Sequence, residues 1–154
     1  MHIPVKVDYG VRALVDLAMH SEGGPIRATE IAARTAISEP YLAQVLHTLS
    51  KAGLIRSHRG PQGGHILARD PSEIRLSVVM ACLGRTDTLV RCLDAANMCI
   101  HVPSCAQRGV WQSVEEAVFN ILDATTIADL VDRTRSMQLG LLGGKPSEPV
   151  NVSV

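Results

Sequence analysis

The stretch that decides the fold is residues 29–68, which reads TEIAARTAISEPYLAQVLHTLSKAGLIRSHRGPQGGHILA. Thr29 is a favourable N-cap for a short helix over 30–35, and Ser38 is a favourable N-cap for the next one. That second helix is expected to run to about Ala52 and to end before a glycine. Two short helices joined by a tight turn are typical of a helix-turn-helix.

A glycine-rich hairpin follows the two helices. Two short extended segments, 54–58 and 65–68, flank the sequence RGPQGG at 59–64. Glycines and a proline between two extended segments indicate a hairpin with a flexible tip. A hairpin placed directly after a helix-turn-helix is a wing, so we predict a winged helix-turn-helix.

Further helices are expected on both sides of this unit. Apolar residues recur at helical spacing over 8–20, and Ser77 can cap a short helix after the wing. The longest helix is expected to begin within 104–107 and to end near Asp123. A last short helix follows it, and after Met137 the Gly, Pro and Ser content predicts a disordered tail.

The longest of these helices carries an apolar stripe whose members recur in steps of three and four, which is coiled-coil spacing. They are Trp111, Val114, Val118 and Ile121, and Leu122 widens the stripe. The expected fold class is therefore mainly α with a small β-hairpin wing, that is, a winged helix-turn-helix plus a long C-terminal helix.

The composition suits a helical domain with an aliphatic core. The chain has 154 residues, of which 46% are apolar and only 3% are aromatic, and such a composition favours helices over a sandwich of strands. We see no secretory signal and no apolar segment that approaches the roughly 20 residues needed to span a bilayer. We therefore expect a cytoplasmic protein that does not insert into a membrane.

The charges are unevenly distributed along the chain. The formal net charge is zero, with 15 basic and 15 acidic side chains. Residues 27–69 nevertheless contain six Lys or Arg and only two acids, whereas six acids face three Lys or Arg from residue 115 onward. A basic stretch over the predicted winged helix is the electrostatic footprint expected of a DNA-binding surface.

The second helix of the motif has one face suited to reading DNA. At about 100° per residue, its core side consists of Leu42, Val45, Leu46 and Leu49. Gln44, His47 and Lys51 fall on the opposite side, where they can bond base edges and phosphates. An ordinary solvated helix face is the alternative, but the wing tip is rich in arginine, which is favoured in a narrow minor groove. The residues expected to contact DNA are Thr29, Ser38, Pro40, Tyr41, Gln44, His47, Lys51, Arg56, His58, Arg59, Gly60 and Gln62.

Three of the four cysteines lie in a segment of weak periodicity before the longest helix. Cys92, Cys99 and Cys105 are separated by six and five residues, gaps wider than the roughly two to four residues usual for structural zinc. Thiolates bind soft metals and iron–sulfur clusters. A cluster, zinc held with the help of His101, and unligated redox-active thiols are therefore all open. Cys82 lies in an apolar helix and is expected to act as a small buried hydrophobe.

Several short stretches of the sequence, taken together, resemble the Rrf2 family of winged-helix regulators over residues 5 to about 132. The likeness rests on DYGVRAL at 8–14, Tyr41-Leu42 with Leu49, GLI at 53–55, RGP at 59–61 with GG at 63–64, and TTIADL at 125–130. The three-cysteine segment also stands where the cluster-binding members of the family carry theirs.

The resemblance implies a homodimer held by the long helix and its apolar stripe. It implies a pseudo-palindromic operator of double-stranded DNA, with one recognition helix in each major groove. It also implies a [2Fe-2S] or [4Fe-4S] cluster on Cys92, Cys99 and Cys105, whose state decides DNA affinity. In the nitric-oxide-sensing branch an N-terminal aspartate of the partner subunit is the fourth ligand, and Asp8 matches that position. The alternatives are that Asp8 caps the first helix and that the fourth ligand is His101, Cys82, water or a small thiol.

Three features depart from the family's pattern. The first cysteine gap is six residues, where five is common. Arg108 stands where the cluster-regulating branch has a histidine, which leaves the fourth ligand open. Ala43 stands where that branch has an acid, which bears on operator preference.

We therefore expect a DNA-binding transcriptional repressor that senses iron or cluster supply, nitric oxide or redox stress. A winged-helix protein-interaction module is the alternative, which the neutral net charge permits. We see no glycine-rich phosphate loop, nucleophile elbow or paired carboxylates, so we expect neither catalysis nor a small-molecule substrate. The expected parts are a winged DNA-binding domain at 1–84, a cysteine-rich loop at 85–106, a dimerisation helix with a short C-terminal helix at 107–136, and a disordered tail at 137–154.

Overall fold

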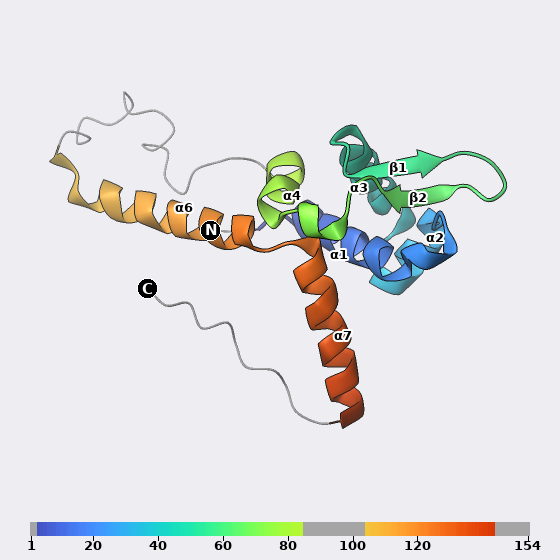
Figure 1. Ribbon diagram of the computed structural model, residues 1–154. Coiled ribbons are helices and arrows are strands. Elements are labelled where there is room, and N and C mark those ends of the chain that lie inside the picture. The colour runs from blue at the N-terminus through green and yellow to red at the C-terminus, as the bar shows by residue number, and fades with distance from the viewer. Residues whose placement is uncertain (1–2, 85–103, 144–154) are drawn as a thin grey trace.

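The computed structural model describes residues 3–84 and 104–143. These residues form helices and one hairpin (Figure 1), which confirms the predicted mainly-α winged fold. In chain order the elements are α1 (Val5–His20), α2 (Ala28–Thr35), α3 (Glu39–Lys51), β1 (Ile55–His58), β2 (Gly64–Leu67), α4 (Leu76–Leu83), α6 (Ala106–Ala124) and α7 (Ile127–Gly143). Short 3₁₀ turns, Ser21–Gly23 and Pro71–Glu73, lie between α1 and α2 and between β2 and α4.

The predicted helix-turn-helix consists of α2 and α3, joined by residues 36–38. Ala36 has a left-handed backbone with a φ of 55°, which ends α2 within one residue, and its amide donates to the Ala32 carbonyl. Ser38 stands at the N-cap position of α3, as predicted, although its side chain forms no capping bond. Both helices pack on α1, so the motif is supported from behind by the first helix.

Two helix starts differ from the sequence prediction. Thr29 is predicted to be the N-cap of α2, but Arg27 occupies that position and its carbonyl accepts the first amide bonds of the helix. Ser77 is predicted to cap α4, but the N-cap there is Arg75. In both cases the helix starts upstream of the hydroxyl side chain, because an upstream backbone carbonyl serves as the first acceptor.

The wing is the antiparallel pair of β1 and β2. Ile55 pairs with Leu67 at its base. Ile26, which lies just before α2, adds a further bridge, since its amide and carbonyl exchange hydrogen bonds of 3.0 and 2.8 Å with His65. The wing is therefore tied to the start of the helix-turn-helix as well as to the end of α3.

One aliphatic core joins all parts of the winged domain. Its fully buried large side chains come from α1, α2, α3, β1 and the segments around them: Leu14, Leu17, Ile31, Leu42, Val45, Leu46, Leu49, Leu54, Ile55 and Ile74. Val79 of α4 and Ile127 of α7 are also fully buried in it. The first turns of α7 thus belong to the winged domain, although they are distant from it in sequence.

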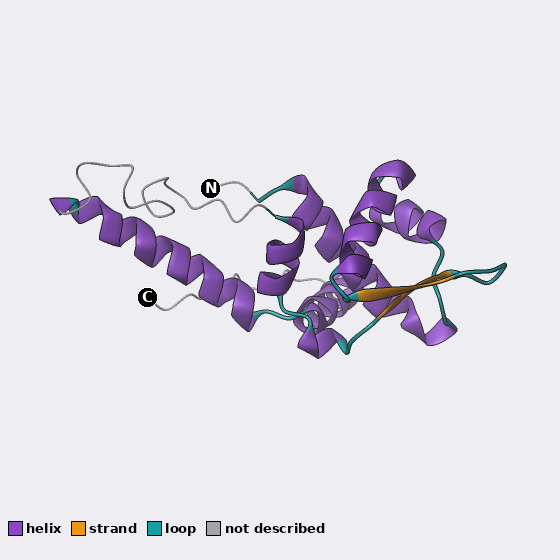
Figure 2. Cartoon of the chain, turned by 90° about the horizontal axis from the view of Figure 1, so that it is seen from above, coloured by secondary structure: helices purple, strands orange, loops and turns teal. Residues whose placement is uncertain are grey.

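α6 leaves this domain in the direction opposite to the wing, as Figure 1 and the perpendicular view in Figure 2 both show. None of its residues is buried, whereas α7 packs back on α1. α7 continues to Gly143, so the prediction of a short last helix is wrong, and residues 137–143 are helical and not part of a tail. Among the helices in the described ranges, none combines the length and apolarity needed to cross a bilayer.

Candidate nucleic-acid interface

α3 presents a polar face to solvent. Its buried side chains are Leu42, Val45, Leu46 and Leu49. Gln44, His47 and Lys51 are exposed on the opposite side, as the helical spacing predicts. Tyr41 is half-buried and meets the Tyr9 ring edge-on, with 5.4 Å between the ring centroids. The helix is therefore anchored through one side while three polar side chains remain accessible.

Three more of the predicted contacts lie at helix starts. Thr29 in the first turn of α2, Ser38 at the N-cap of α3 and Pro40 in the first turn of α3 are all exposed. Helix N-termini favour phosphate, because unpaired amides and the helix dipole both attract negative charge. These positions suit contacts with a nucleic-acid backbone.

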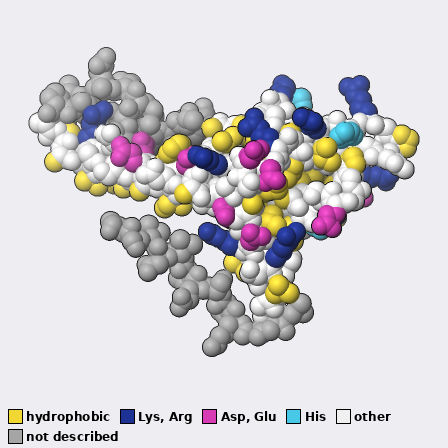
Figure 3. Space-filling model, in the orientation of Figure 1, with side chains coloured by type: hydrophobic (Ala, Val, Ile, Leu, Met, Phe, Trp, Pro, Cys, Tyr) yellow, Lys and Arg dark blue, Asp and Glu magenta, His cyan; other side chains and the backbone are white. Residues whose placement is uncertain are grey.

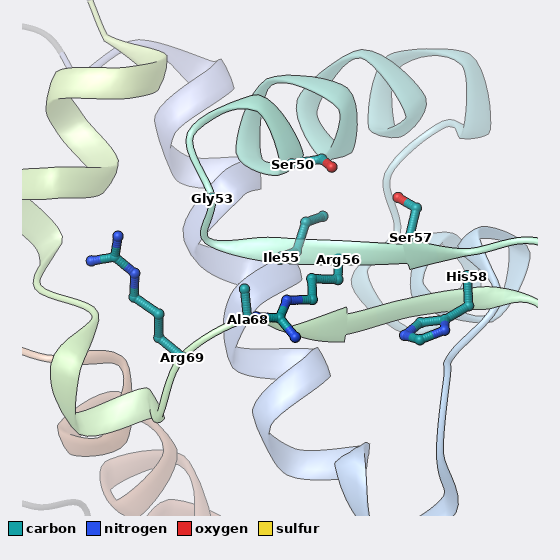
Figure 4. A pocket seen from close by; sticks show the side chains of 8 residues that line it. All are labelled: Ser50, Gly53, Ile55, Arg56, Ser57, His58, Ala68 and Arg69. Carbon is teal, nitrogen blue, oxygen red and sulfur yellow. The ribbon is translucent and has the colours of Figure 1, made fainter.

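A hollow of about 630 Å³ lies between the end of α3 and the wing. Figure 4 shows Arg56 and His58 leaving β1 on one side of the strand, while Ile55 and Ser57 leave it on the other. The residues that line the hollow are Ser50, Gly53, Ile55, Arg56, Ser57, His58, Ala68 and Arg69. Arg56, His58 and Arg69 are exposed, so the hollow is open and basic and suits a phosphate group.

Arg69 and two serines of this hollow were not among the predicted contacts. Arg69 closes the basic stretch 27–69 but follows β2, outside both motifs, so its charge is the only sequence signal for it. Ser50 and Ser57 become candidates only because the wing packs beside the end of α3. A sequence motif cannot indicate such a placement, since it depends on tertiary packing.

The tip of the wing carries the remaining predicted contacts. Arg59, Gly60 and Gln62 are exposed, and the φ of Gly60 is 114°, a conformation that favours glycine. The Arg27 guanidinium donates a 3.0 Å hydrogen bond to the Pro61 carbonyl. Arg27, which the sequence marks only as a charge, thus braces the tip from the start of α2.

His65 stiffens the base of the wing. Its Nδ1 lies 3.1 Å from the Ser57 hydroxyl on the facing strand, and its backbone pairs with Ile26. Burial lowers the pKa of His65, so the ring is neutral near pH 7. The wing is therefore held at its base and at its tip.

Basic side chains are most numerous over the winged domain, and apolar side chains line one edge of α6 (Figure 3). Trp111, Val114 and Ile121 of the predicted stripe are 39%, 37% and 49% exposed, and Val118 and Leu122 are half-buried. One chain thus combines a basic surface with an exposed apolar helix.

The predicted metal ligands lie only partly within the described residues. Cys92, Cys99 and His101 are outside them, and Cys105 is half-buried at the N-cap position of α6. Within 3–84 and 104–143 no three His, Cys, Asp or Glu side chains are grouped to hold a metal. Cys82 is half-buried against the core, and burial raises the pKa of its thiol, which agrees with its predicted role as a small hydrophobe.

Asp8 lies exposed in the first turn of α1. Its carboxylate is 2.8 Å from the guanidinium of Arg12, which in turn lies over the Tyr9 ring. The N-cap of α1 is Pro4, so the alternative that Asp8 caps this helix is wrong. Its exposure leaves the carboxylate accessible to a second molecule.

Known proteins share both the sequence and the fold. A family model described as Rrf2, an iron-dependent transcriptional regulator, matches residues 3–133. The HTH-type transcriptional regulator IscR of Serratia proteamaculans is 32% identical, with 100% of this chain and 99% of the relative covered. The structure of T. potens IscR has a TM-score of 0.73 at 34% identity, covering 90% of this chain and 91% of the other. That of CymR, the global cysteine regulator of B. subtilis, has a TM-score of 0.73 at 31% identity, covering 86% and 97%.

Proposed function

The chain belongs to the Rrf2 family of transcriptional regulators, and on this premise we propose that it acts as a homodimeric repressor on a pseudo-palindromic operator, with an iron–sulfur cluster controlling its affinity. It is a DNA-binding regulator and not an enzyme. The observation that carries the proposed reading surface is the junction of the polar face of α3 with the basic hollow beside the wing.

In the proposed complex α3 enters the major groove. Gln44 and His47 lie in the middle of its exposed face, where a side-chain amide can pair with the edge of adenine. Lys51 at the end of α3 and the arginines of the hollow, Arg56 and Arg69, supply charge for phosphates. The middle of the helix thus specifies sequence, while its end and the hollow supply affinity.

The wing tip is proposed to enter the adjacent minor groove. Arg59 and Gln62 flank Gly60 there, and the glycine allows the backbone to approach the groove closely. The brace from Arg27 to the Pro61 carbonyl holds the tip before DNA arrives. Such pre-organisation reduces the ordering cost of binding.

The apolar stripe of α6 supports a homodimer. An exposed apolar patch on a helix indicates an interaction surface, and coiled-coil spacing suits packing against a helix of the same kind. The proposed partner is a second copy of this chain, bound through Trp111, Val114, Val118, Ile121 and Leu122. A two-fold dimer presents two copies of α3, which matches an operator of two half-sites.

The chemistry of the donor set fits an iron–sulfur cluster. Cys92, Cys99 and Cys105 offer three thiolates, the ligands that such clusters prefer, and the exposed carboxylate of Asp8 from the second copy is the proposed fourth ligand, with His101 as the alternative. When bound, the cluster supplies a group that reacts with oxidants and nitric oxide. Cys105 directly precedes α6, so the position of its thiolate is linked to the start of that helix.

Binding to duplexes selected from a random pool tests the reading surface. Lys51→Ala is expected to weaken binding to all sequences alike and to reduce the slope of log affinity against log salt by about one. Gln44→Ala is expected to lose about 1–3 kcal/mol of base discrimination at one position. Arg133→Ala, which removes an exposed cation on α7, is the matched control. If both α3 variants behave like the control, α3 is not the reading helix.

Spectra of protein purified without oxygen test the cluster. Visible absorption and electron paramagnetic resonance are expected to show a chromophore in the wild type and none in Cys99→Ala. Cys82→Ala is the matched control and should keep the chromophore, because Cys82 packs against the core. Identical spectra for all three proteins would remove the cluster from the proposal.

A further inference from the structure

Two connecting segments lie side by side where α6 meets the winged domain. The Leu76 amide donates to the Thr125 carbonyl at 2.9 Å, and the Ile127 amide donates to the Ile74 carbonyl at 2.9 Å. Arg75 and Thr126 form an antiparallel bridge between these bonds. We call residues 74–77 and 123–127 the joint. It connects the start of α4 with the end of α6 and the start of α7.

The Asp123 carboxylate closes the joint with side-chain bonds. Ser77 donates a 2.6 Å hydrogen bond to one of its oxygens, and the Arg75 guanidinium donates a 2.7 Å bond to the other. The hydrogen bond from Ser77 and the charge of Arg75 lower the pKa of Asp123, so the carboxylate is ionised near pH 7. Asp123 lies in the last turn of α6, whereas both of its donors belong to the start of α4.

The joint is held more firmly where it leads into α4 and α7 than where it leads into α6. Ile74 and Ile127 are fully buried, so the ends of the joint that lead into α4 and α7 are fixed by the core. α6 has no buried residue; apart from its packing beside α4, it is attached through the joint. The direction of α6 relative to α3 therefore depends on its packing beside α4 and on the polar bonds of the joint.

A small rotation at the joint has a large effect at the far end of α6. The helix has 19 residues, which makes it about 28 Å long. A rotation of about 10° moves its far end by about 5 Å, more than the roughly 3.4 Å rise of one base pair. In a dimer paired through α6, such a rotation changes the distance between the two α3 helices by an amount that DNA registers.

We propose that Arg75, Ser77 and Asp123 are positioning residues. By holding the direction of α6, they set which distance between operator half-sites the dimer accepts. The inference rests on the proposed function, since it requires a dimer paired through α6 and an operator of two half-sites. It assigns to the joint a role in specificity that is separate from base contacts. None of the three residues needs to touch DNA.

Operators with altered spacing test this inference. After the wild type has selected its preferred duplex, its affinity is measured with one or two base pairs inserted or deleted between the half-sites. The wild type is expected to lose about tenfold or more per base pair, comparable to an unfavourable base pair within a site. Asp123→Asn and Ser77→Ala are expected to lose clearly less, which gives a flatter profile. Asp132→Asn, an equal charge change at an exposed position of α7, should keep the wild-type profile.

Hydrogen exchange supplies a readout that does not involve DNA. In Asp123→Asn the amides of Leu76 and Ile127, which bond across the joint, are expected to exchange severalfold faster, while the Leu46 amide in α3 stays unchanged. Unaltered exchange at the joint and a wild-type spacing profile in both variants would overturn the inference. A wild type that selects no duplex would instead overturn the proposed function, so the two failures are distinguishable.

Discussion

A buried ion pair between α1 and α2 holds the helix-turn-helix in place, and its removal gives a quantitative prediction. Asp16 of α1 is 6% exposed. Arg34 of α2 donates two hydrogen bonds to its carboxylate, from Nε at 2.7 Å and from Nη2 at 2.8 Å. The Nδ1 atom of the His20 ring lies 3.5 Å from the same carboxylate. Arg34→Met therefore leaves a carboxylate in the interior with one weak partner.

The expected cost follows from burial. Breaking a buried ion pair by removing one partner costs about 3–5 kcal/mol, and the lower end applies because Arg34 is itself 35% exposed. The pair of Arg12 and Asp8 has the same 2.8 Å contact on α1, but its side chains are 53% and 48% exposed. Arg12→Met is therefore expected to cost less than about 1 kcal/mol.

Urea denaturation followed by helical circular dichroism measures both variants. With equal m-values, the difference between the midpoints gives the change in the free energy of unfolding. The double variant Arg34→Met with Asp16→Leu replaces the pair by apolar side chains and should recover much of the loss. If Arg34→Met costs no more than Arg12→Met, burial does not set the strength of these pairs and the reasoning is refuted.

Three further changes test the wing and α6. Gly64→Ala would place a Cβ 2.5 Å from the Ile26 carbonyl oxygen, so it is expected to open the bridge to His65 and to cost about 1–3 kcal/mol, measured by urea denaturation and by faster exchange of the His65 amide. Burial lowers the pKa of His65 in the folded chain. As the pH falls below about 6.5, the unfolded chain therefore binds more protons than the folded chain, and the free energy of unfolding decreases. Thermal denaturation between about pH 7 and pH 5.5 should therefore show a smaller loss for His65→Gln than for the wild type. Val114→Glu places a charge in the stripe of α6 and should shift sedimentation from dimer to monomer. Phe119→Glu, roughly 140° away around the helix, should not, and equal behaviour of the two variants would argue against the stripe as the interface.

The parts of the fold that sequence reasoning predicts well are those with a local physical cause. The two sides of α3 follow from the helical period, and the structure buries Leu42, Val45, Leu46 and Leu49 as that period requires. The hairpin follows from glycines placed between short extended segments, and β1 and β2 form there. Both signals lie within a few residues of the structure they specify, so tertiary packing does not change them.

The boundary of α7 illustrates a local signal that is overruled. Glycines after Met137 favour a tail, yet the helix continues to Gly143. Its start is strongly fixed, because Thr126 and Asp129 exchange side-chain and backbone hydrogen bonds in a capping box and Ile127 is buried. Helix propagation costs far less than nucleation, so a well-nucleated helix extends through residues that would not start one.

Contacts between distant segments are the part that sequence reasoning misses. Ser77 is expected to cap its own helix but bonds Asp123, 46 residues away. Arg27 braces Pro61 across 34 residues. No periodicity or capping rule connects such positions, because the contacts arise only after the elements have packed. Arg69 is a further case. The basic stretch 27–69 marks it as a charge suited to DNA binding, but the sequence does not indicate the hollow that Arg69 lines.

Two helices flank the cysteine-bearing segment in sequence, and they would transmit a change in that segment in different ways. α4, which precedes it, packs on α1 and α3 and contributes Val79 and Leu83 to the core. A shift of α4 therefore requires Val79 and Leu83 to pack differently against the core, which costs about 1–3 kcal/mol or more. α6, which follows it, contributes no buried residue; it packs beside α4 and is attached through the partly exposed polar bonds of the joint. Movement of α6 is therefore the less costly response, and in the proposed dimer it alters the distance between the two α3 helices without altering α3 itself. Loss of the proposed cluster is thus expected to weaken binding to a full operator much more than binding to a duplex with one half-site. Affinities for the two duplexes, measured with cluster-loaded protein and with the Cys99→Ala variant, test this expectation. An equal loss on both duplexes would show that the change reaches α3 through α4.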